Sequence, residues 1–387
     1  MGFTQALVLA LAAATIEGAC APGSGGAAAS PQNMVVSQAP DFVRPYVLPK
    51  YRGRSIMLSQ AEVLRFAITT NSSGGAFSMI QHNGQFNNNV SARYHDHHNV
   101  HEHLYCARGR VQFWAQKNTS EGEQEARQAT PGDYASLPTG TIHTFQLVDP
   151  DAQLTHVFHP AGFEHLFDVF YGEGKYDSST SAPYLATAFD ESPFAGTLSP
   201  EAIASLNSLD LYLHDNFVPR RDFVNGTAGD SRLNWHDGPN ELPTKYGEPY
   251  AIAKDYGPKF LNAENGYKIV QPFADKNTEK DFTMGTVILS PKLDNETVTT
   301  TTLPHHFALQ MEDGHLILAV DGYESVALLH GDVAFIPAGT KFSYHADVPY
   351  TKFMYMNNGT EGLDHQLMQK AVPWGWPTYP HYAGYKA

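Results

Sequence analysis

Histidine is unusually dense in one short stretch of this 387-residue chain. Five histidines and one glutamate lie between His95 and His103. Imidazole nitrogens combined with a carboxylate suit divalent transition metals, whereas calcium and magnesium prefer oxygen ligands alone. No run of charges or helical periodicity accounts for this density. The stretch therefore predicts a transition-metal site, and a solvated His-rich loop with no fixed metal is the alternative.

Two runs with a regular spacing of His, Glu, Gly and Pro single out some residues of the cluster. The first run is His95-x-His97, Glu102 and Gly109, and the second is Gly132, Pro138, Gly140 and His143. A rival pair, His101-x-His103, has no carboxylate in the four residues that follow it. We therefore interpret His98, His101 and His103 as neighbours of the ligands or as surface groups.

The surrounding sequence predicts the elements that hold these residues. From Glu62 onward, short stretches rich in aromatic and β-branched residues alternate with Gly, Asn and Pro, as in VLRFAITT, RVQFWAQ and TFQLV. Such stretches are typical of short antiparallel strands in a sandwich or barrel, so an all-β fold is expected. Helical spacing of apolar residues occurs at 162–171. A further helix is expected to begin at Ser199 and Pro200.

The strand pattern occurs twice. GDYASLPTGTIHTF at 132–145 aligns with GDVAFIPAGTKFSY at 331–344, and GFEHLF at 162–167 aligns with GLDHQL at 362–367. A period of about 200 residues is too long for a solenoid and indicates two copies of one domain. We expect a signal peptide at 1–29 and an N-terminal domain at 30–171, which includes a Pro-rich arm at 30–60. A linker with a short helix is expected at 172–245, and a C-terminal domain at 246–387.

The two spaced runs resemble the two motifs of the cupin superfamily, whose fold is a jelly-roll barrel, also called a double-stranded β-helix. The resemblance implies two cupin domains and a metal held by four residues: His95, His97, Glu102 and His143. Residues two apart on a strand face the same side, so the first two histidines can bind one ion. Glu102 is expected from the neighbouring strand, and His143 from a strand distant in the sequence.

The second copy keeps the scaffold without these ligands. His143 aligns with Phe342. Aligning Gly109 with Gly314 places three residues without metal-binding side chains opposite the other ligands: Thr300, Thr302 and Phe307. One metal ion per chain is therefore expected.

One copy with ligands and one without is similar to the secreted fungal quercetin 2,3-dioxygenases. Stretches that carry this resemblance are GRVQFWAQ at 109–116, TPGDYASLPTGTIHTFQ at 130–146 and PYAIAKDYGPKFLNAENGY at 249–267. The resemblance implies cleavage of flavonols such as quercetin by O₂, with release of carbon monoxide and a depside. It implies copper as the metal, with iron, manganese or nickel as alternatives, and a homodimer. Glu102 is the carboxylate expected to take the proton of the flavonol 3-hydroxyl.

Two other functions stay open. One is a different bicupin oxygenase or decarboxylase that uses the same four ligands, and the other is a non-catalytic metal-binding or storage cupin. Phe113, Trp114 and Phe145 could line a pocket for a flat aromatic ligand or form ordinary barrel core. Leu104 stands where the family is expected to have phenylalanine, and could reshape that pocket.

Composition bounds the partners and the compartment. A net charge of −15 argues against nucleic acid and against an anionic membrane. The short apolar run from Ala6 to Ile16, followed by small residues, is typical of a signal peptide, so a secreted, extracellular protein is expected. The lone mature thiol, Cys106, is interpreted as a small buried hydrophobe. Six sequons are candidate glycosylation sites: Asn71, Asn89, Asn118, Asn225, Asn295 and Asn358.

Overall fold

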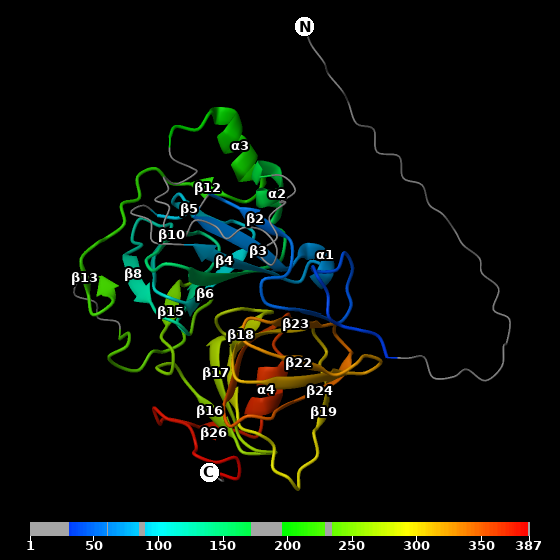
Figure 1. Ribbon diagram of the computed structural model, residues 1–387. Helices are drawn as coiled ribbons and strands as arrows, with labels where there is room; N and C mark the ends of the chain where they lie inside the picture. Colours follow the sequence, from blue (N-terminus) through cyan, green and yellow to red (C-terminus); the bar gives the residue numbers. More distant parts are fainter. Residues whose placement is uncertain (1–30, 60, 85–89, 172–195, 229–233, 386–387) are drawn as a thin grey trace, which may run out of the picture.

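The computed structural model describes residues 31–59, 61–84, 90–171, 196–228 and 234–385. The chain forms two β-barrels, each built from two packed sheets (Figure 1). The expected all-β architecture with two cupin domains is confirmed. The predicted signal peptide and the sequon at Asn89 lie outside the described residues.

The first barrel contains the His-rich stretch. One of its sheets has seven strands in the order β12 (Tyr212–Leu213), β5 (His95–Asp96), β10 (Thr141–Leu147), β7 (Val111–Lys117), β8 (Gln124–Ala129), β14 (Thr227–Ala228) and β13 (Phe223–Val224). The facing sheet also has seven, in the order β15 (Tyr250–Ile252), β9 (Tyr134–Leu137), β6 (His101–Arg108), β11 (Ala152–His159), β4 (Ser78–Gly84), β3 (Glu62–Ile68) and β2 (Ser55–Met57). Apolar side chains from both sheets, among them Leu104 and Phe145, form the core between them.

The second barrel repeats this plan. Its larger sheet has eight strands in the order β1 (Tyr46–Leu48), β23 (Val333–Ile336), β20 (Phe307–Asp313), β25 (Thr351–Asn357), β18 (Thr283–Leu289), β17 (Lys268–Ala274), β16 (Phe260–Asn262) and β26 (Val372–Pro373). Its smaller sheet has four, in the order β19 (Thr300–Thr302), β24 (Lys341–Ala346), β21 (Leu316–Val320) and β22 (Val326–Leu328).

Four helices occur in the described part of the chain: α1 (Thr70–Ser73), α2 (His165–Tyr171), α3 (Pro200–Ser208) and α4 (Leu363–Met368). The predicted start of α3 is confirmed, because the Ser199 side chain accepts a hydrogen bond from the Ala202 N–H and Pro200 occupies the first turn. In Figure 1, α2 and α3 lie at the end of the first barrel that is remote from the second. None of the described helices is both long and apolar enough to cross a membrane.

The barrels exchange edge strands. β1, from the N-terminal arm, pairs with β23 of the second barrel, with Tyr46 opposite Phe335. In return β15, from the start of the second half, pairs with β9 of the first, with Ala251 opposite Ala135. This corrects the expectation that the whole Pro-rich arm packs on the first domain. The reason is that β9 and β23 would otherwise be open sheet edges, and each is covered by a strand from the opposite half.

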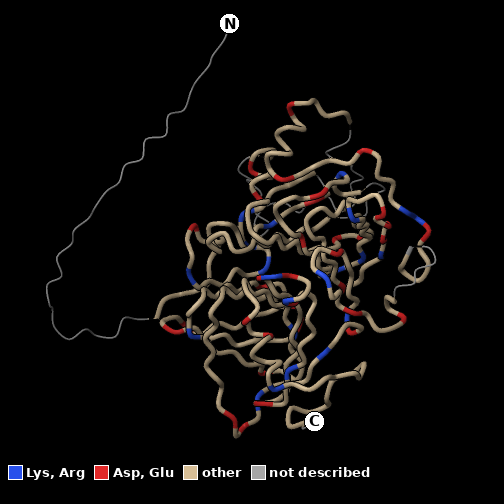
Figure 2. The backbone as a smooth tube through the Cα atoms, turned by 180° about the vertical axis from the view of Figure 1, so that it is seen from behind, with Lys and Arg blue, Asp and Glu red and all other residues tan. Residues whose placement is uncertain are grey.

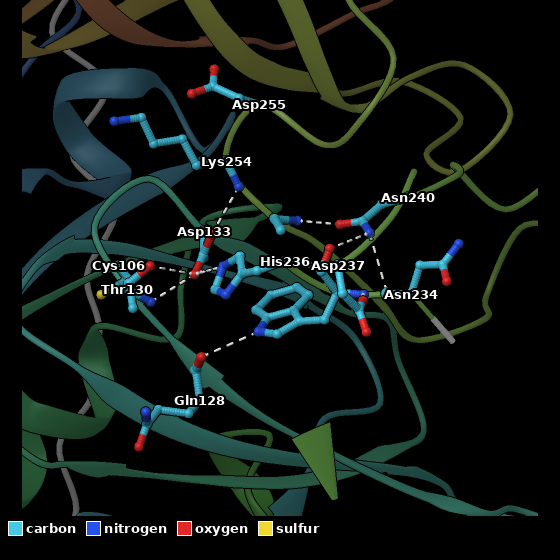
Figure 3. Close-up of polar contacts among 12 residues, drawn as sticks. Cys106, Gln128, Thr130, Asp133, Asn234, His236, Asp237, Asn240, Lys254 and Asp255 are labelled. Atoms are coloured by element: carbon cyan, nitrogen blue, oxygen red, sulfur yellow. Dashed lines mark hydrogen bonds and ion pairs between the residues drawn. The ribbon is translucent and has the colours of Figure 1, made fainter. Parts of the chain in front are cut away.

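Equivalent aspartates, Asp133 buried and Asp332 partly buried, anchor the exchanged segments. Asp133 accepts hydrogen bonds from the Thr130 and Lys254 N–H groups at 2.7 and 2.8 Å, and from Nε2 of His236 at 2.8 Å (Figure 3). Its counterpart Asp332 accepts one from the Lys50 N–H at 2.8 Å. The same Gly-Asp turn therefore receives a strand from the other half in both barrels.

A shared hydrophobic core joins the two barrels. The rings of Phe77 and Phe282 meet edge to face at 5.9 Å, and those of Tyr134 and Phe273 stack at 5.0 Å. Acidic and basic residues are interspersed along both barrels (Figure 2). Apolar packing and strand pairing thus both join the two halves.

Candidate metal centre

Both sheets of the first barrel contribute to the candidate centre. His95 on β5 lies directly opposite His143 on β10, and His97 follows β5. One ligand atom from each of these residues and one from Glu102 lie within 4.8 Å of one another, and all four residues are buried. The structure thus brings together the four predicted residues. Glu102, however, does not come from a neighbouring strand, because β6 pairs with β9 and β11 and faces β5 across the barrel interior.

The three imidazoles are all oriented by backbone carbonyls. Nδ1 lies 2.6 Å from the Arg93 oxygen in His95, 2.6 Å from the Asp210 oxygen in His97 and 2.8 Å from the Thr141 oxygen in His143. A carbonyl can only accept, so each Nδ1 must donate. In a neutral ring Nε2 is then unprotonated, and this is the state that binds a metal.

The Glu102 carboxylate completes the centre. Oε2 lies 2.8 Å from Nε2 of His143 and 3.5 Å from Nε2 of His97, while Oε1 accepts from Nδ1 of His156 at 2.6 Å. Burial alone would raise the pKa of Glu102, but its contacts with His143, His156 and His97 outweigh burial and hold the pKa well below its usual value. The carboxylate is therefore ionised.

Four electron-pair donors converge on one point, and this is what a metal site requires. Bonds of about 2.0–2.2 Å from one ion place its ligand atoms up to about 4.4 Å apart, close to the 4.8 Å within which these four atoms lie. Burial, followed by the neighbouring His143 and His97, holds the pKa of His95 well below its usual value. That ring is thus neutral and able to bind a metal at neutral pH.

Asp210 organises the centre from the linker. It follows α3 in a left-handed conformation (φ 64°), and its carbonyl oxygen orients His97. Its carboxylate accepts the N–H groups of three consecutive loop residues at 3.0–3.1 Å: His98, Asn99 and Val100. Asp210 was not predicted as part of the site. An aspartate just after a helix was the only local signal, and its partners lie more than 100 residues away.

The remaining histidines of the dense stretch serve other contacts. His98 is half-exposed and stacks on Tyr212 with ring centroids 3.7 Å apart. His101 and His103 point away from the centre because residues on β6 alternate. Nδ1 of His101 lies 2.8 Å from Oε2 of Glu279, on the second barrel. These three histidines thus lie outside the four-residue cluster.

An apolar cavity of about 60 Å³ reaches the candidate centre. His95 and Glu102 lie in its wall with His82, His156 and ten apolar residues, among them Leu64, Ile80, Phe145, Phe158, Phe163 and Leu211. Of the aromatic residues considered from the sequence, Phe145 lines it. Phe113 packs instead on Trp235, and the indole N–H of Trp114 donates to the Arg220 carbonyl at 2.7 Å. Leu104 is not among the lining residues but lies directly behind them, opposite His156 and in one core cluster with Phe145.

The second barrel has hydrophobic packing at the equivalent place. The Gly339 N–H donates to the Leu303 carbonyl as the Gly140 N–H donates to that of His97, and Phe342 pairs with Thr301. The structural counterparts of His95 and His97 are therefore Thr301 and Leu303, one residue later than the sequence alignment placed them. Phe307 and Phe342 keep the predicted positions, and their rings stack at 5.6 Å.

No protein-family model matches the chain. Among solved structures, oxalate decarboxylase from Bacillus subtilis at pH 4.6 has a TM-score of 0.49 at 14% identity over 84% of this chain and 78% of its own. YlbA from E. coli has a TM-score of 0.45 at 12% identity over 84% of this chain and 95% of its own. Both structures are too distant to bear on the activity.

Two curated proteins are similar in sequence. A quercetin 2,3-dioxygenase from Bacillus subtilis is 22% identical over 318 residues, 80% of this chain and 81% of that protein. A quercetin 2,3-dioxygenase from Aspergillus japonicus is 36% identical over 350 residues, 90% of this chain and 98% of that protein. With this identity along nearly the whole fungal enzyme, the chain belongs to the quercetin 2,3-dioxygenase family of bicupins.

Proposed function

We propose that the protein is a metal-dependent flavonol dioxygenase. It would cleave the heterocyclic ring of flavonols such as quercetin with O₂ and release carbon monoxide and a depside. The observation that carries the proposal is the convergence of three oriented imidazoles and Glu102 at the wall of an apolar cavity, in a chain of this family. We propose His95, His97, Glu102 and His143 as the metal ligands.

Glu102 is proposed as the catalytic base. A bound transition metal would stabilise the deprotonated 3-oxygen of the flavonol. The Glu102 carboxylate lies in the cavity wall and is ionised, so it can accept the 3-hydroxyl proton there. Nδ1 of His156 donates to Oε1 and fixes the orientation of the carboxylate. Phe145, Phe158 and Phe163 surround the reacting position with hydrophobic surface, which excludes water.

The cavity suits a flat aromatic ligand in character, although its size requires movement. Pockets for ligands of this size usually measure about 300–1,000 Å³. The space in this structure is about 60 Å³. Side chains in its wall must therefore move apart when a flavonol enters.

The activity is tested with purified, metal-loaded protein and quercetin in air. We expect loss of the visible absorbance of quercetin, uptake of O₂ and release of one carbon monoxide per quercetin consumed. Absence of turnover in protein whose metal content has been verified would contradict the proposal. Oxalate is the comparison substrate, since a decarboxylase acting through the same ligands would release CO₂ from it.

Copper is proposed as the metal, at one ion per chain. Three imidazoles and a carboxylate form a borderline-soft ligand set, for which copper has the highest affinity among the divalent first-row metals. Elemental analysis of protein expressed with each metal, together with electron paramagnetic resonance of the copper form, tests this. Two tightly bound ions per chain, or activity only with iron, manganese or nickel, would contradict it.

Secretion and glycosylation also belong to the proposal. Four of the sequon asparagines are exposed, namely Asn71, Asn118, Asn225 and Asn295, and Asn358 is half-buried. Expression of the full chain in a secreting eukaryotic host should deliver protein to the medium, shortened at the N-terminus. Endoglycosidase treatment should lower its mass, and retention inside the cell without glycans would contradict the assignment. We also propose a homodimer, and light scattering of the same material should give about twice the mass of one chain; the mass of a single chain would contradict it.

A further inference from the structure

Two histidines outside the four-ligand cluster lie in the wall of the apolar cavity. His82 on β4 is 2% exposed and His156 on β11 is 6% exposed. Their rings stack with centroids 5.5 Å apart and 27° between the planes. Phe145 packs against both, at 5.5 and 5.1 Å. Buried polar rings in such a wall are unfavourable unless they form hydrogen bonds.

Each of the two rings has one nitrogen without a hydrogen-bond partner among the described residues, and in both this is Nε2. In His156, Nδ1 donates to Glu102, so Nε2 of the neutral ring is an acceptor. In His82, Nε2 lies 3.5 Å from Oε2 of Glu62, which also lacks a hydrogen-bond partner among the described residues, and this separation is too long for a good hydrogen bond. Two residues that line the cavity thus each have a buried ring nitrogen without a partner among the described residues, and buried polar atoms in native proteins nearly always have one.

We propose that His82 and His156 form a hydrogen-bonding wall that selects flavonols carrying hydroxyl groups besides the 3-hydroxyl. The inference rests on the proposed function and specifies its substrate class. A flavonol whose 3-oxygen lies at Glu102 also lies beside His156, because these two side chains are in contact. A ring hydroxyl then donates to Nε2 of His156, and a second bonds with Nε2 of His82.

The selectivity follows from the hydrogen bonds that are lost when a flavonol lacks those hydroxyls. A flavonol that carries only the 3-hydroxyl leaves both nitrogens buried and unpaired, and a site built to bind a hydroxyl discriminates strongly against such a ligand. If each hydrogen bond contributes roughly tenfold in affinity, the preference for the polyhydroxylated ligand is about 100-fold.

The test compares quercetin with 3-hydroxyflavone. Binding of each to the metal-loaded full chain is measured without O₂, from the shift in ligand absorbance, and kcat/KM is measured in air. We expect the wild type to prefer quercetin by about 100-fold, and His82→Phe to reduce that preference by about tenfold. His82→Gln, which keeps a donor and an acceptor, should retain most of it. His156→Phe lowers turnover of both ligands through Glu102, and the ratio of the two binding constants isolates its effect on selection.

Phe145→Leu is the matched control, because it alters the same wall without changing a hydrogen-bonding group. It should change the affinity for both ligands by a similar factor and leave their ratio intact. A wild type that binds both ligands within about threefold, or an unchanged ratio in folded His82→Phe and His156→Phe, would overturn the inference. Turnover of both flavonols in that case leaves the proposed function standing. If neither ligand binds the metal-loaded protein, the inference and the proposed function both fail.

Discussion

Oε2 of Glu102 lies 2.8 Å from Nε2 of His143, whose other nitrogen donates to the Thr141 carbonyl. A hydrogen bond between these two atoms requires a proton on Nε2, and a metal bound to both atoms would replace that proton. We therefore expect the stability of the barrel to depend on the metal.

Removal of the metal should therefore destabilise the protein. At metal concentrations of about 100 to 1,000 times the dissociation constant, binding adds about 3–4 kcal/mol to the free energy of unfolding. Chelated protein should unfold at a lower temperature by calorimetry, and stoichiometric copper should restore the transition. His143→Ala should show no such copper-dependent rise. An identical unfolding temperature for chelated and metal-loaded wild type would contradict this prediction.

Glu102→Gln should abolish most turnover. The amide keeps the shape of the side chain and an acceptor for His156, but it cannot take up the substrate proton. We expect kcat to fall at least about 100-fold, with quercetin consumption as the measurement and metal content determined in parallel. Glu121→Gln, on an exposed turn after β7, is the control and should behave as wild type. Undiminished turnover by metal-loaded Glu102→Gln would exclude this residue as the base.

Asp210→Ala should weaken metal binding although Asp210 is not a ligand. Its carboxylate holds the loop that joins His97 to β6, and loss of such supporting contacts typically costs about 10–100-fold in metal affinity. Competition with a chromophoric chelator measures the effect. Asp215→Ala is the matched control, since Asp215 is an exposed residue of the same linker that pairs with Arg93. Equal metal affinity in Asp210→Ala and Asp215→Ala would show that the loop does not need this anchor.

Asp364 should make the second barrel sensitive to pH. It is 2% exposed and accepts hydrogen bonds from Thr283 and Asn357, and burial raises its pKa from 3.8 to about 6. Because the pKa is higher in the folded state, the stabilising contribution is complete below about pH 4 and is lost as pH rises through about 6. The loss is on the order of 3 kcal/mol.

Asp364→Asn, which cannot ionise, should therefore gain stability relative to wild type between pH 5 and pH 8. Melting temperatures of both proteins at the two pH values measure the gain. Asp321→Asn, on an exposed turn after β21, is the control and should differ from wild type by the same amount at both pH values. A constant difference between Asp364→Asn and wild type across this range would contradict the raised pKa.

The parts of the structure that were predictable have local signals. His95 and His97 were identifiable from strand alternation, and His143 from the Gly-Pro-Gly turn that precedes its strand. Asp210 was not, because only the packing of the linker brings it to the loop. His156 had a weak signal, since it occupies an inward position between Leu154 and Phe158 on β11.

Other errors had a different physical origin. The one-residue error in the second barrel arose in a run of threonines, 299–302, where every register has a similar pattern. The strand that carries Glu102 was expected beside that of His95 and His97 but lies in the facing sheet. Spacing along the chain does not say whether a loop returns to the same sheet or crosses to the facing one. The strand exchange depends on pairing between residues almost 300 positions apart, and short strands carry no signal for their partners.

The exchanged edge strands also constrain how the chain can mature as it is synthesised. β1 emerges early from the ribosome, yet its partner β23 ends at residue 336 of 387. The first barrel likewise lacks one edge until β15 has been translated. Neither half is complete when the first domain leaves the exit tunnel, and each has an unpaired sheet edge until the other is present. The two halves therefore reach the native state together. Separate fragments would be two incomplete barrels, each prone to aggregate through its unpaired sheet edge.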